Sequence, residues 1–128
     1  MKIYLDTQSA IWIAQARTVK LMSRRAMQAI SDAETVLISP MVIFEMKAIY
    51  RKKRIEYPPP EMIFLLREQL KVEVCSIPFA EVVAVSMGVD WTTDPNDILI
   101  TANAMVNGRA GLVTSDRLIR ANYEQAIW

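Results

Sequence analysis

The stretch KIYLDTQSAIWIAQA, residues 2–16, contains the two local patterns that decide the fold of this chain. Residues 2–5 form a short apolar run that ends at Asp6, which is typical of a strand buried on both faces. Residues 9–16 have the apolar spacing of a helix. A strand followed by a helix, if repeated along the chain, predicts a parallel sheet joined by right-handed crossovers.

The same alternation continues to the end of the chain. Further β-branched runs predict strands at TVLIS (35–39), VEVCSI (72–77) and GLVTS (111–115), and QAIW (125–128) is a candidate edge strand. Helical spacing occurs in 9–16, 23–33, 40–53, 60–70, 79–87, 95–107 and 116–123. We therefore expect an α/β fold with a central parallel sheet of four to five strands and helices on both faces.

Length and composition indicate the class of protein. The 128 residues, 52% hydrophobic and 23% charged, predict a single domain, 1–128, with one core. No apolar stretch reaches the roughly 18 residues of a membrane span, and Asp6 interrupts the N-terminus before a signal peptide could form, so we expect a soluble, cytoplasmic protein. A net charge of +1 argues against binding nucleic acid by bulk electrostatics alone.

The absence of histidine restricts the available chemistry. It excludes Ser–His and Cys–His nucleophile pairs and zinc sites that contain histidine. The single cysteine, Cys75, lies in an apparent buried strand and is expected to be a structural thiol. Carboxylates remain as the main candidates for site chemistry, and they favour hard cations such as Mg²⁺ or Mn²⁺.

Several carboxylates follow predicted strands or begin predicted helices. Asp6 ends the first strand, Asp116 follows the strand at 111–115, and Asp97 begins a late helix. Ligands of open parallel sheets bind outside the carboxyl ends of the strands. Glu45 interrupts an apolar helix flank and needs a partner there. The other members of that flank, expected to face inward, are Met41, Phe44, Ala48 and Ile49.

Each acidic residue also has a structural explanation. Asp6 and Asp116 can cap the helices that follow them, although Thr114 or Ser115 could cap in place of Asp116. Asp94 is a natural cap because Pro95 fits the first helical position. Asp97 would then lie in the first turn, where the helix dipole favours a carboxylate. Glu45 could instead turn to solvent or pair with Lys52 or another basic residue.

Taken together, the motifs IYLDT (3–7), FEM (44–46), DPNDILITANAM (94–105) and LVTSD (112–116) resemble a PIN domain, particularly the toxin ribonucleases of VapBC toxin–antitoxin modules. The resemblance covers almost the whole chain and implies a single PIN-like domain. It also implies a ribonuclease that hydrolyses RNA phosphodiester bonds with Mg²⁺ or Mn²⁺. The implied site residues are Asp6, Glu45, Asp97 and Asp116, with Asp94 as an accessory position. A cognate antitoxin and a homodimer are the implied protein partners.

Electrostatics gives an independent reason to expect a cation if these four carboxylates meet. At separations of about 5 Å and an effective dielectric constant near 20, each like-charge pair costs roughly 3 kcal/mol. Divalent cations relieve that repulsion, and without them at least one carboxyl group should take up a proton.

The chain departs from the commonest PIN pattern at two positions. Many relatives have His where this chain has Gln8, and Arg where it has Ile98. Both changes leave the carboxylates in place but alter how substrate phosphate would be held. The basic run RKKR (51–54) either completes a helix end or contacts phosphate, and Arg117 is another candidate for phosphate contact.

Other interpretations remain open at this stage. The early helix, with Trp12 beside Ile13, either packs in the core or exposes an apolar strip to a partner. Haloacid-dehalogenase-like phosphatases need a second Asp where this chain has Gln8, and response-regulator receivers need an Asp after a middle strand. The main alternative is a catalytically inactive PIN-like interaction module, whose acids are caps and surface charges.

Overall fold

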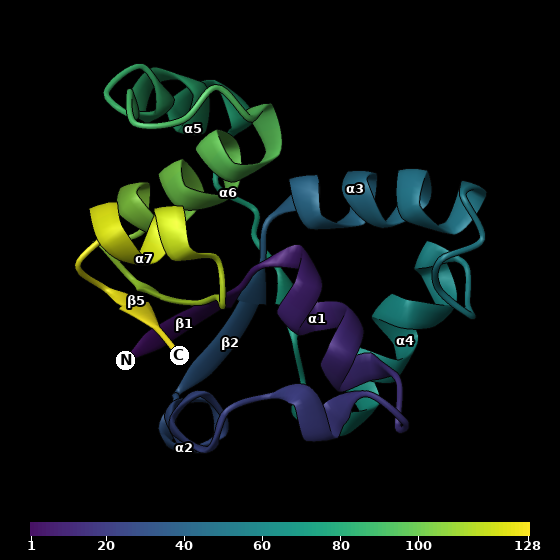
Figure 1. Ribbon diagram of the computed structural model, residues 1–128. Helices are drawn as coiled ribbons and strands as arrows, with labels where there is room; N and C mark the ends of the chain where they lie inside the picture. Colours follow the sequence, from purple (N-terminus) through teal and green to yellow (C-terminus); the bar gives the residue numbers. More distant parts are fainter.

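A five-stranded, fully parallel sheet forms the centre of the protein, which a computed structural model describes over residues 1–128 (Figure 1). The strands are β1 (Lys2–Leu5), β2 (Thr35–Ile38), β3 (Glu73–Val74), β4 (Gly111–Val113) and β5 (Ala126–Ile127). Their order in the sheet is β3-β2-β1-β4-β5, so the chain builds outward from β1 first on one side and then on the other. The predicted parallel sheet is confirmed, including its C-terminal edge strand.

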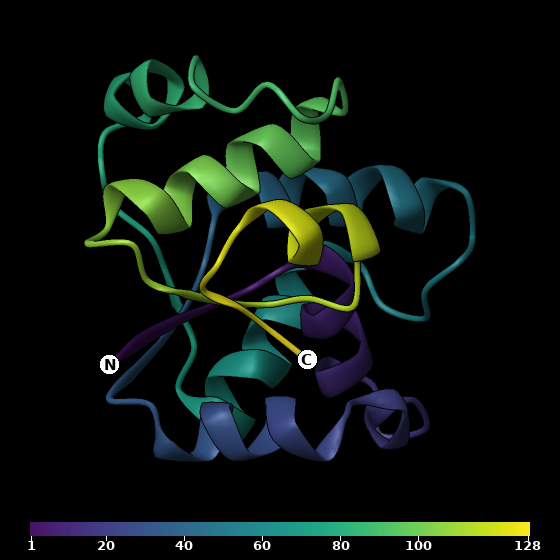
Figure 2. The same cartoon turned by 60° about the vertical axis from the view of Figure 1, so that its left-hand side comes forward.

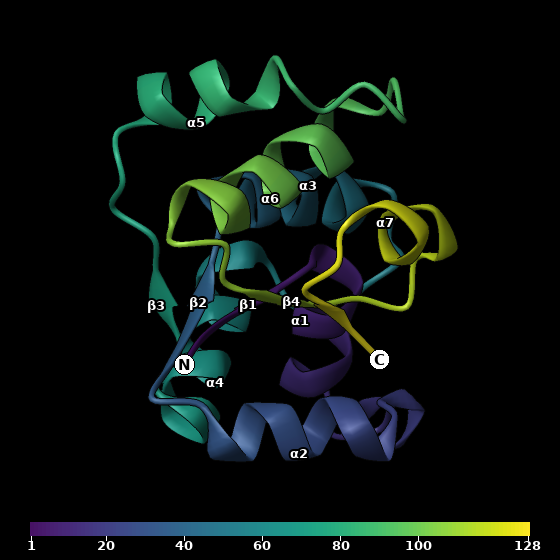
Figure 3. The ribbon, with the colours of Figure 1, turned by 90° about the vertical axis from the view of Figure 1, so that its left-hand side faces the viewer.

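Seven α-helices and one 3₁₀ turn connect the strands. They are α1 (Thr7–Ala14), η1 (Val19–Leu21), α2 (Arg24–Asp32), α3 (Pro40–Arg51), α4 (Pro59–Leu70), α5 (Phe79–Ser86), α6 (Pro95–Val106) and α7 (Arg117–Asn122). Helices α1, α2 and α4 lie on one side of the sheet, and α5, α6 and α7 lie on the other (Figures 1 and 3). Every predicted helix begins and ends within two residues of the observed one.

Helix α3 connects the two layers. It follows β2 directly and packs against α1 and α4 on one side and α6 on the other. Helix α5 packs on α6 at the outside of the molecule, and an extended segment leads from it to the start of α6 (Figure 2). None of the helices combines the length and the apolar composition needed to cross a bilayer.

The central strands are buried on both faces, as their apolar sequences predict. Tyr4, Leu5 and Leu112 are fully buried. The Tyr4 hydroxyl donates to Cys75 Sγ at 3.0 Å and accepts a bond from Asn107 Nδ2 at 2.8 Å. These bonds satisfy a polar group inside the sheet and tie β1 to α6. Cys75 is a free, buried thiol.

Two predicted strands are shorter than expected. The run 72–77 contributes only β3, because its partner β2 ends at Ile38 and one further bond, Cys75 N to Ile38 O at 2.8 Å, completes the pairing. The run 111–115 ends as a strand at Val113, beside the end of β1 at Leu5. The residues after Val113 are therefore free to begin the turn into α7.

The packing of α1 decides between the two alternatives that its sequence left open, and the expected packing of α3 is partly wrong. In α1, Ile11 and Ile13 are buried and Trp12 packs against Trp128, with ring centroids 5.9 Å apart, so core packing accounts for this segment. In α3, Phe44 is 65% exposed and Ala48 is also exposed, so the expected inward face is wrong at both positions. The buried face of α3 instead contains Val42 and Met46.

Candidate active site

A cavity of about 240 Å³ lies at the carboxyl ends of β1 and β4, where the strand order reverses. Its lining residues come from both layers of helices and from α3. They are Asp6, Thr7, Gln8, Glu45, Ile49, Asp97, Ile100, Ser115 and Asp116. The structure therefore brings all four predicted carboxylates to one place.

Asp6 and Asp116 act as helix caps and also line the cavity. Asp6 Oδ1 accepts a bond from Ser9 N at 2.8 Å, and Asp116 Oδ1 accepts bonds from Leu118 N and Ile119 N, both at 2.9 Å. A carboxylate has a second oxygen with its own lone pairs. Capping is therefore compatible with a functional role, and Oδ2 of Asp116 accepts no hydrogen bond from the protein.

The two acids that begin α6 have separate positions. Asp94 Oδ1 accepts bonds from Asn96 N at 2.9 Å and Asp97 N at 3.2 Å, which makes Asp94 the cap. Asp94 is exposed and does not line the cavity. Asp97, three residues later in the first turn, does line it. The predicted division, with Asp94 as cap and Asp97 facing the site, agrees with this arrangement.

Glu45 is held by a hydroxyl group and has no basic partner. Thr7 Oγ1 donates a hydrogen bond to Glu45 Oε1, which joins the start of α1 to α3. Glu45 forms no ion pair with Lys52 and is only partly buried. Sequence reasoning did not assign a role to Thr7, although its position directly after Asp6 is a signal that could have pointed to it.

Burial and crowding of like charges raise the pKa of Asp97 to about 7. Burial is the largest cause, and the negative charges of Asp94, Asp116, Glu45 and Asp6 add to it in that order. A carboxyl group with this pKa is about half protonated at neutral pH. The four acids therefore interact electrostatically across the cavity.

Asp6 is more deeply enclosed than Asp97. Burial raises its pKa above the ordinary value of an aspartate, and the charge of Asp116 adds to this effect. Hydrogen bonds from Thr114 and Ser9 stabilise the ionised form and act in the opposite direction. Asp6 is consequently a carboxylate that the fold both desolvates and orients.

No cation of the protein neutralises this cavity. No Lys or Arg lines it, and none of its four carboxylates takes part in an ion pair. Carboxylate and hydroxyl oxygens are the donors that Mg²⁺ and Mn²⁺ prefer, so the residues fit such an ion in their chemistry. No group of three or more Asp, Glu, His or Cys side chains is, however, already arranged to hold an ion by itself.

The other residues singled out in the sequence lie at different distances from the cavity. Gln8 is part of its lining, whereas Ile98, Arg117 and the run 51–54 are not. Ser115, which precedes Asp116, lines the cavity and was considered in the sequence only as a possible cap. The signal for Ser115 was its place in the turn directly after β4.

Comparison with known proteins gives one relative by sequence and several by structure. The chain is 29% identical over 121 residues to Ribonuclease VapC22 of Mycobacterium tuberculosis, a match that covers 94% of this chain and 91% of the relative. No protein-family model matches the chain.

Three solved structures share the fold. VapBC2 from Rickettsia felis, bound to a DNA fragment from its promoter, has a TM-score of 0.65 at 15% identity and covers 98% of this chain and 96% of its own. A toxin–antitoxin complex from Klebsiella pneumoniae has a TM-score of 0.64 at 18% identity with the same coverage. VapBC-1 from nontypeable Haemophilus influenzae has a TM-score of 0.58 at 17% identity and covers 91% and 87% of the two chains.

These relationships agree with the resemblance found in the motifs. The sequence match covers 94% of the chain, and two of the structural matches cover 98% of it. The chain is therefore similar in sequence to a VapC ribonuclease, and it shares its fold with chains of VapBC and other toxin–antitoxin complexes.

Proposed function

We propose that this chain is a metal-dependent endoribonuclease and the toxin of a toxin–antitoxin pair. One observation carries the proposal: four carboxylates from distant parts of the chain line one cavity that contains no basic residue. The names of its relatives support the same activity, since one is a ribonuclease and the others come from toxin–antitoxin complexes. The location of its RNA substrate would place it in the cytoplasm.

Asp6, Glu45, Asp97 and Asp116 would hold one or two Mg²⁺ or Mn²⁺ ions, directly or through water. Such an ion supplies a bound water of lowered pKa and electrostatic stabilisation of the phosphate and the leaving oxygen. The protein orients its own ligands: Ser9 N fixes Asp6, and Thr7 fixes Glu45. Because the chain has no histidine, the carboxylates are also its only local proton acceptors near neutral pH.

An RNA cleavage assay tests this function. The native chain should cut RNA with Mg²⁺ or Mn²⁺, stop on addition of EDTA, and lose activity in Asp6→Asn, which keeps the shape of the side chain. Asp90→Asn is the matched control, because Asp90 is an exposed aspartate away from the cavity. Cleavage that persists in EDTA or in Asp6→Asn contradicts the proposal.

A second readout separates the toxin from an inactive interaction module. Metal that binds only the folded state raises its melting temperature. A rise with Mn²⁺ that disappears in Asp97→Asn supports a working site. If the native chain neither cleaves RNA nor gains stability from metal, the four carboxylates do not form a metal site and the chain is an inactive interaction module.

Protein partners are the remaining part of the proposal. An antitoxin that covers the cavity would inhibit the toxin, and a second copy of the chain would complete a dimer.

The outer face of α5 exposes three apolar side chains at intervals of four residues, which places them in one stripe along the helix. They are Phe79, Val83 and Met87, which are 52%, 38% and 75% exposed. We assign this stripe to the dimer. Light scattering of Met87→Asp should then show monomers where the native chain forms dimers.

A further inference from the structure

Two residues of the basic run Arg51–Arg54 line a second cavity at the C-terminal end of α3. This cavity has a volume of about 350 Å³ and is lined by Tyr50, Arg51, Lys53 and Ile55. Ile49, the residue before Tyr50, lines the acidic cavity. Ile49 and Tyr50 are consecutive residues of α3, so the two cavities lie at neighbouring positions along the helix axis but on sides of the helix about 100° apart.

The four cations of this run have no acidic partners. All four side chains from Arg51 to Arg54 are exposed, and none takes part in an ion pair. The negative end of the α3 dipole accounts for cations in its last turn, but its effect decays within that turn. Lys53 and Arg54 lie beyond the helix end, so helix stability does not explain the complete run.

The turn that presents these cations is fixed by its backbone. Lys53 has a φ of 58°, in the left-handed region, and reverses the chain after α3. Lys53 N donates to Tyr50 O at 2.8 Å, and Arg54 N donates to Ile49 O at 3.2 Å. The cations are therefore attached to a defined turn and not to a free loop.

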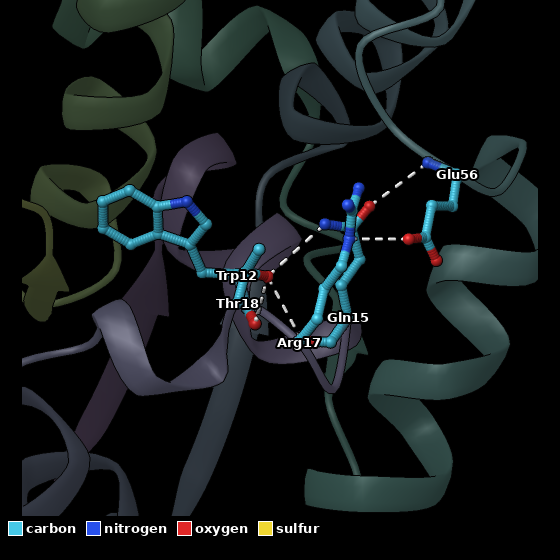
Figure 4. Close-up of polar contacts among 5 residues, drawn as sticks. All are labelled: Trp12, Gln15, Arg17, Thr18 and Glu56. Carbon is cyan, nitrogen blue, oxygen red and sulfur yellow. Dashed lines mark hydrogen bonds and ion pairs between the residues drawn. The ribbon is translucent and has the colours of Figure 1, made fainter.

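Polar contacts with the end of α1 hold the same turn from the other side (Figure 4). Gln15 is buried, and its Oε1 accepts a bond from Glu56 N at 3.2 Å. Arg17 Nε lies 2.6 Å from Glu56 Oε1. Thr18 Oγ1 donates to Trp12 O at 3.0 Å and completes the anchor. Because Arg17 already pairs with Glu56, the acid that lies nearest in sequence does not neutralise the basic run.

We propose that Tyr50 and the run Arg51–Arg54 form a subsite for the RNA strand next to the cleaved bond, with the cations on phosphates and Tyr50 on a base. This inference rests on the proposed ribonuclease function. Glu45 and Arg51 are six residues apart, or about 9 Å along the helix axis. These two residues lie on different faces of α3, so RNA that leaves the acidic cavity would pass around the last turn of the helix, a path of several nucleotides at roughly 3.4 Å of rise per phosphate.

The combination of groups favours RNA over an acidic peptide. Single strands are held by cations that follow the backbone and by aromatic rings on which bases stack. Tyr50 is 39% exposed and lines the same cavity as Arg51 and Lys53, so both kinds of group face one strand. The cations also give the RNA an attractive contact beside four carboxylates that repel its phosphates.

RNA binding without cleavage tests the subsite. The probe is a fluorescein-labelled single-stranded RNA of about 12 nucleotides, and its binding to the intact chain is measured in EDTA over a series of salt concentrations. The test variant is Arg51→Gln with Lys53→Gln. The control is Arg24→Gln with Arg25→Gln, which removes the same charge from exposed positions on α2, beside a different cavity.

Each phosphate contact with a single strand contributes about 0.7 to the slope of log K against log salt. The test variant should lose about 1.4 from this slope and bind about 25-fold more weakly at ~0.1 M salt, whereas the control should change little. Tyr50→Ala should weaken binding at least about fivefold and Tyr50→Phe should not, because the phenyl ring still stacks.

Three results would overturn the subsite. The first is an equal loss of RNA affinity in the test and control variants, and the second is no loss in either variant. The third is a polyglutamate peptide that binds more tightly than RNA and depends on the same residues, Arg51 and Lys53. Cleavage by the native chain is scored separately with Mg²⁺. If the test variant loses more RNA binding than the control but the native chain does not cleave RNA, only the ribonuclease proposal is contradicted. If the native chain cleaves RNA and the substitutions at Arg51 and Lys53 change neither binding nor cleavage, only the subsite is contradicted.

Discussion

Asp97→Asn should stabilise the metal-free protein while it removes a residue of the proposed site. Asp97 has a pKa of about 7 in the folded protein against an ordinary value of 3.8. The folded state therefore binds the proton more tightly than the unfolded state, and ionisation of Asp97 opposes folding. Ionisation of Asp97 does not change the free energy of unfolding below about pH 4. It lowers this free energy increasingly between about pH 4 and pH 7, and the loss is constant above about pH 7. Asparagine has the same shape and no charge.

The size of the effect follows from the two pKa values. Their difference corresponds to about 4 kcal/mol in the free energy of unfolding at about 1.4 kcal/mol per pH unit. Asp97 is only partly buried, and solvent screening reduces this to about 1–2 kcal/mol. Loss of a carboxylate from the first turn of α6 costs about 0.3–1 kcal/mol through the helix dipole. The net gain is about 1 kcal/mol at pH 8, or about 3–5 °C in melting temperature.

Urea unfolding in EDTA between about pH 4.5 and pH 8 measures this gain. The advantage of Asp97→Asn over the native chain should grow with pH, while Asp90→Asn, at an exposed position, should show no such trend. Saturating Mg²⁺ should reverse the order, since ligand at 100 times its Kd stabilises the native chain by about 2.7 kcal/mol. A variant that is equally stable to the native chain at pH 8, or less stable, would refute the electrostatic reasoning.

Three further changes test how individual side chains are held. Asp116→Ala should abolish RNA cleavage and lower the free energy of unfolding by about 1 kcal/mol, because it removes the α7 cap. Asp116→Asn should abolish cleavage without this loss of stability. Urea unfolding and a cleavage assay on both variants distinguish the two effects. Thr7→Val should reduce cleavage at least about tenfold because it removes the hydroxyl that holds Glu45, whereas Thr7→Ser, which keeps the hydroxyl, should cleave like the native chain. Equal cleavage by the two variants would contradict this role of Thr7. Thr101→Val should raise the free energy of unfolding by about 1 kcal/mol, because Thr101 Oγ1 is buried without a hydrogen-bond partner; a lower unfolding midpoint would contradict that explanation.

The fold could be predicted from the sequence because its signals are local. The apolar run 2–5 ends at Asp6, and that acid both ends β1 and begins α1. Pro40 and Pro95 stand at the first position of α3 and α6, which fixed the start of both helices. Strand lengths were less predictable, because the end of β3 depends on where its partner β2 ends.

The candidate site could be predicted only in part. Its carboxylates follow strands or begin helices, so general rules for parallel sheets bring them together. The contact between Thr7 and Glu45 joins residues 38 positions apart, and no local pattern indicates it. The exposure of Phe44 was also unpredictable, since an apolar residue beside Glu45 looks inward-facing until the packing of α3 on α1, α4 and α6 is known.

Three helix N-termini explain how the fold tolerates this acidic cavity. Helices α1, α6 and α7 all begin beside it, capped by Asp6, Asp94 and Asp116. The positive end of each helix dipole stabilises a nearby carboxylate by about 0.3–1 kcal/mol and rarely by as much as 2. A pair of carboxylates about 5 Å apart would cost roughly 3 kcal/mol, so the dipoles would offset only part of such a repulsion. Uptake of a proton by Asp97, whose pKa is about 7, removes more of it. We expect a divalent cation to displace that proton, so metal binding should release protons to solution and strengthen as pH rises through 7.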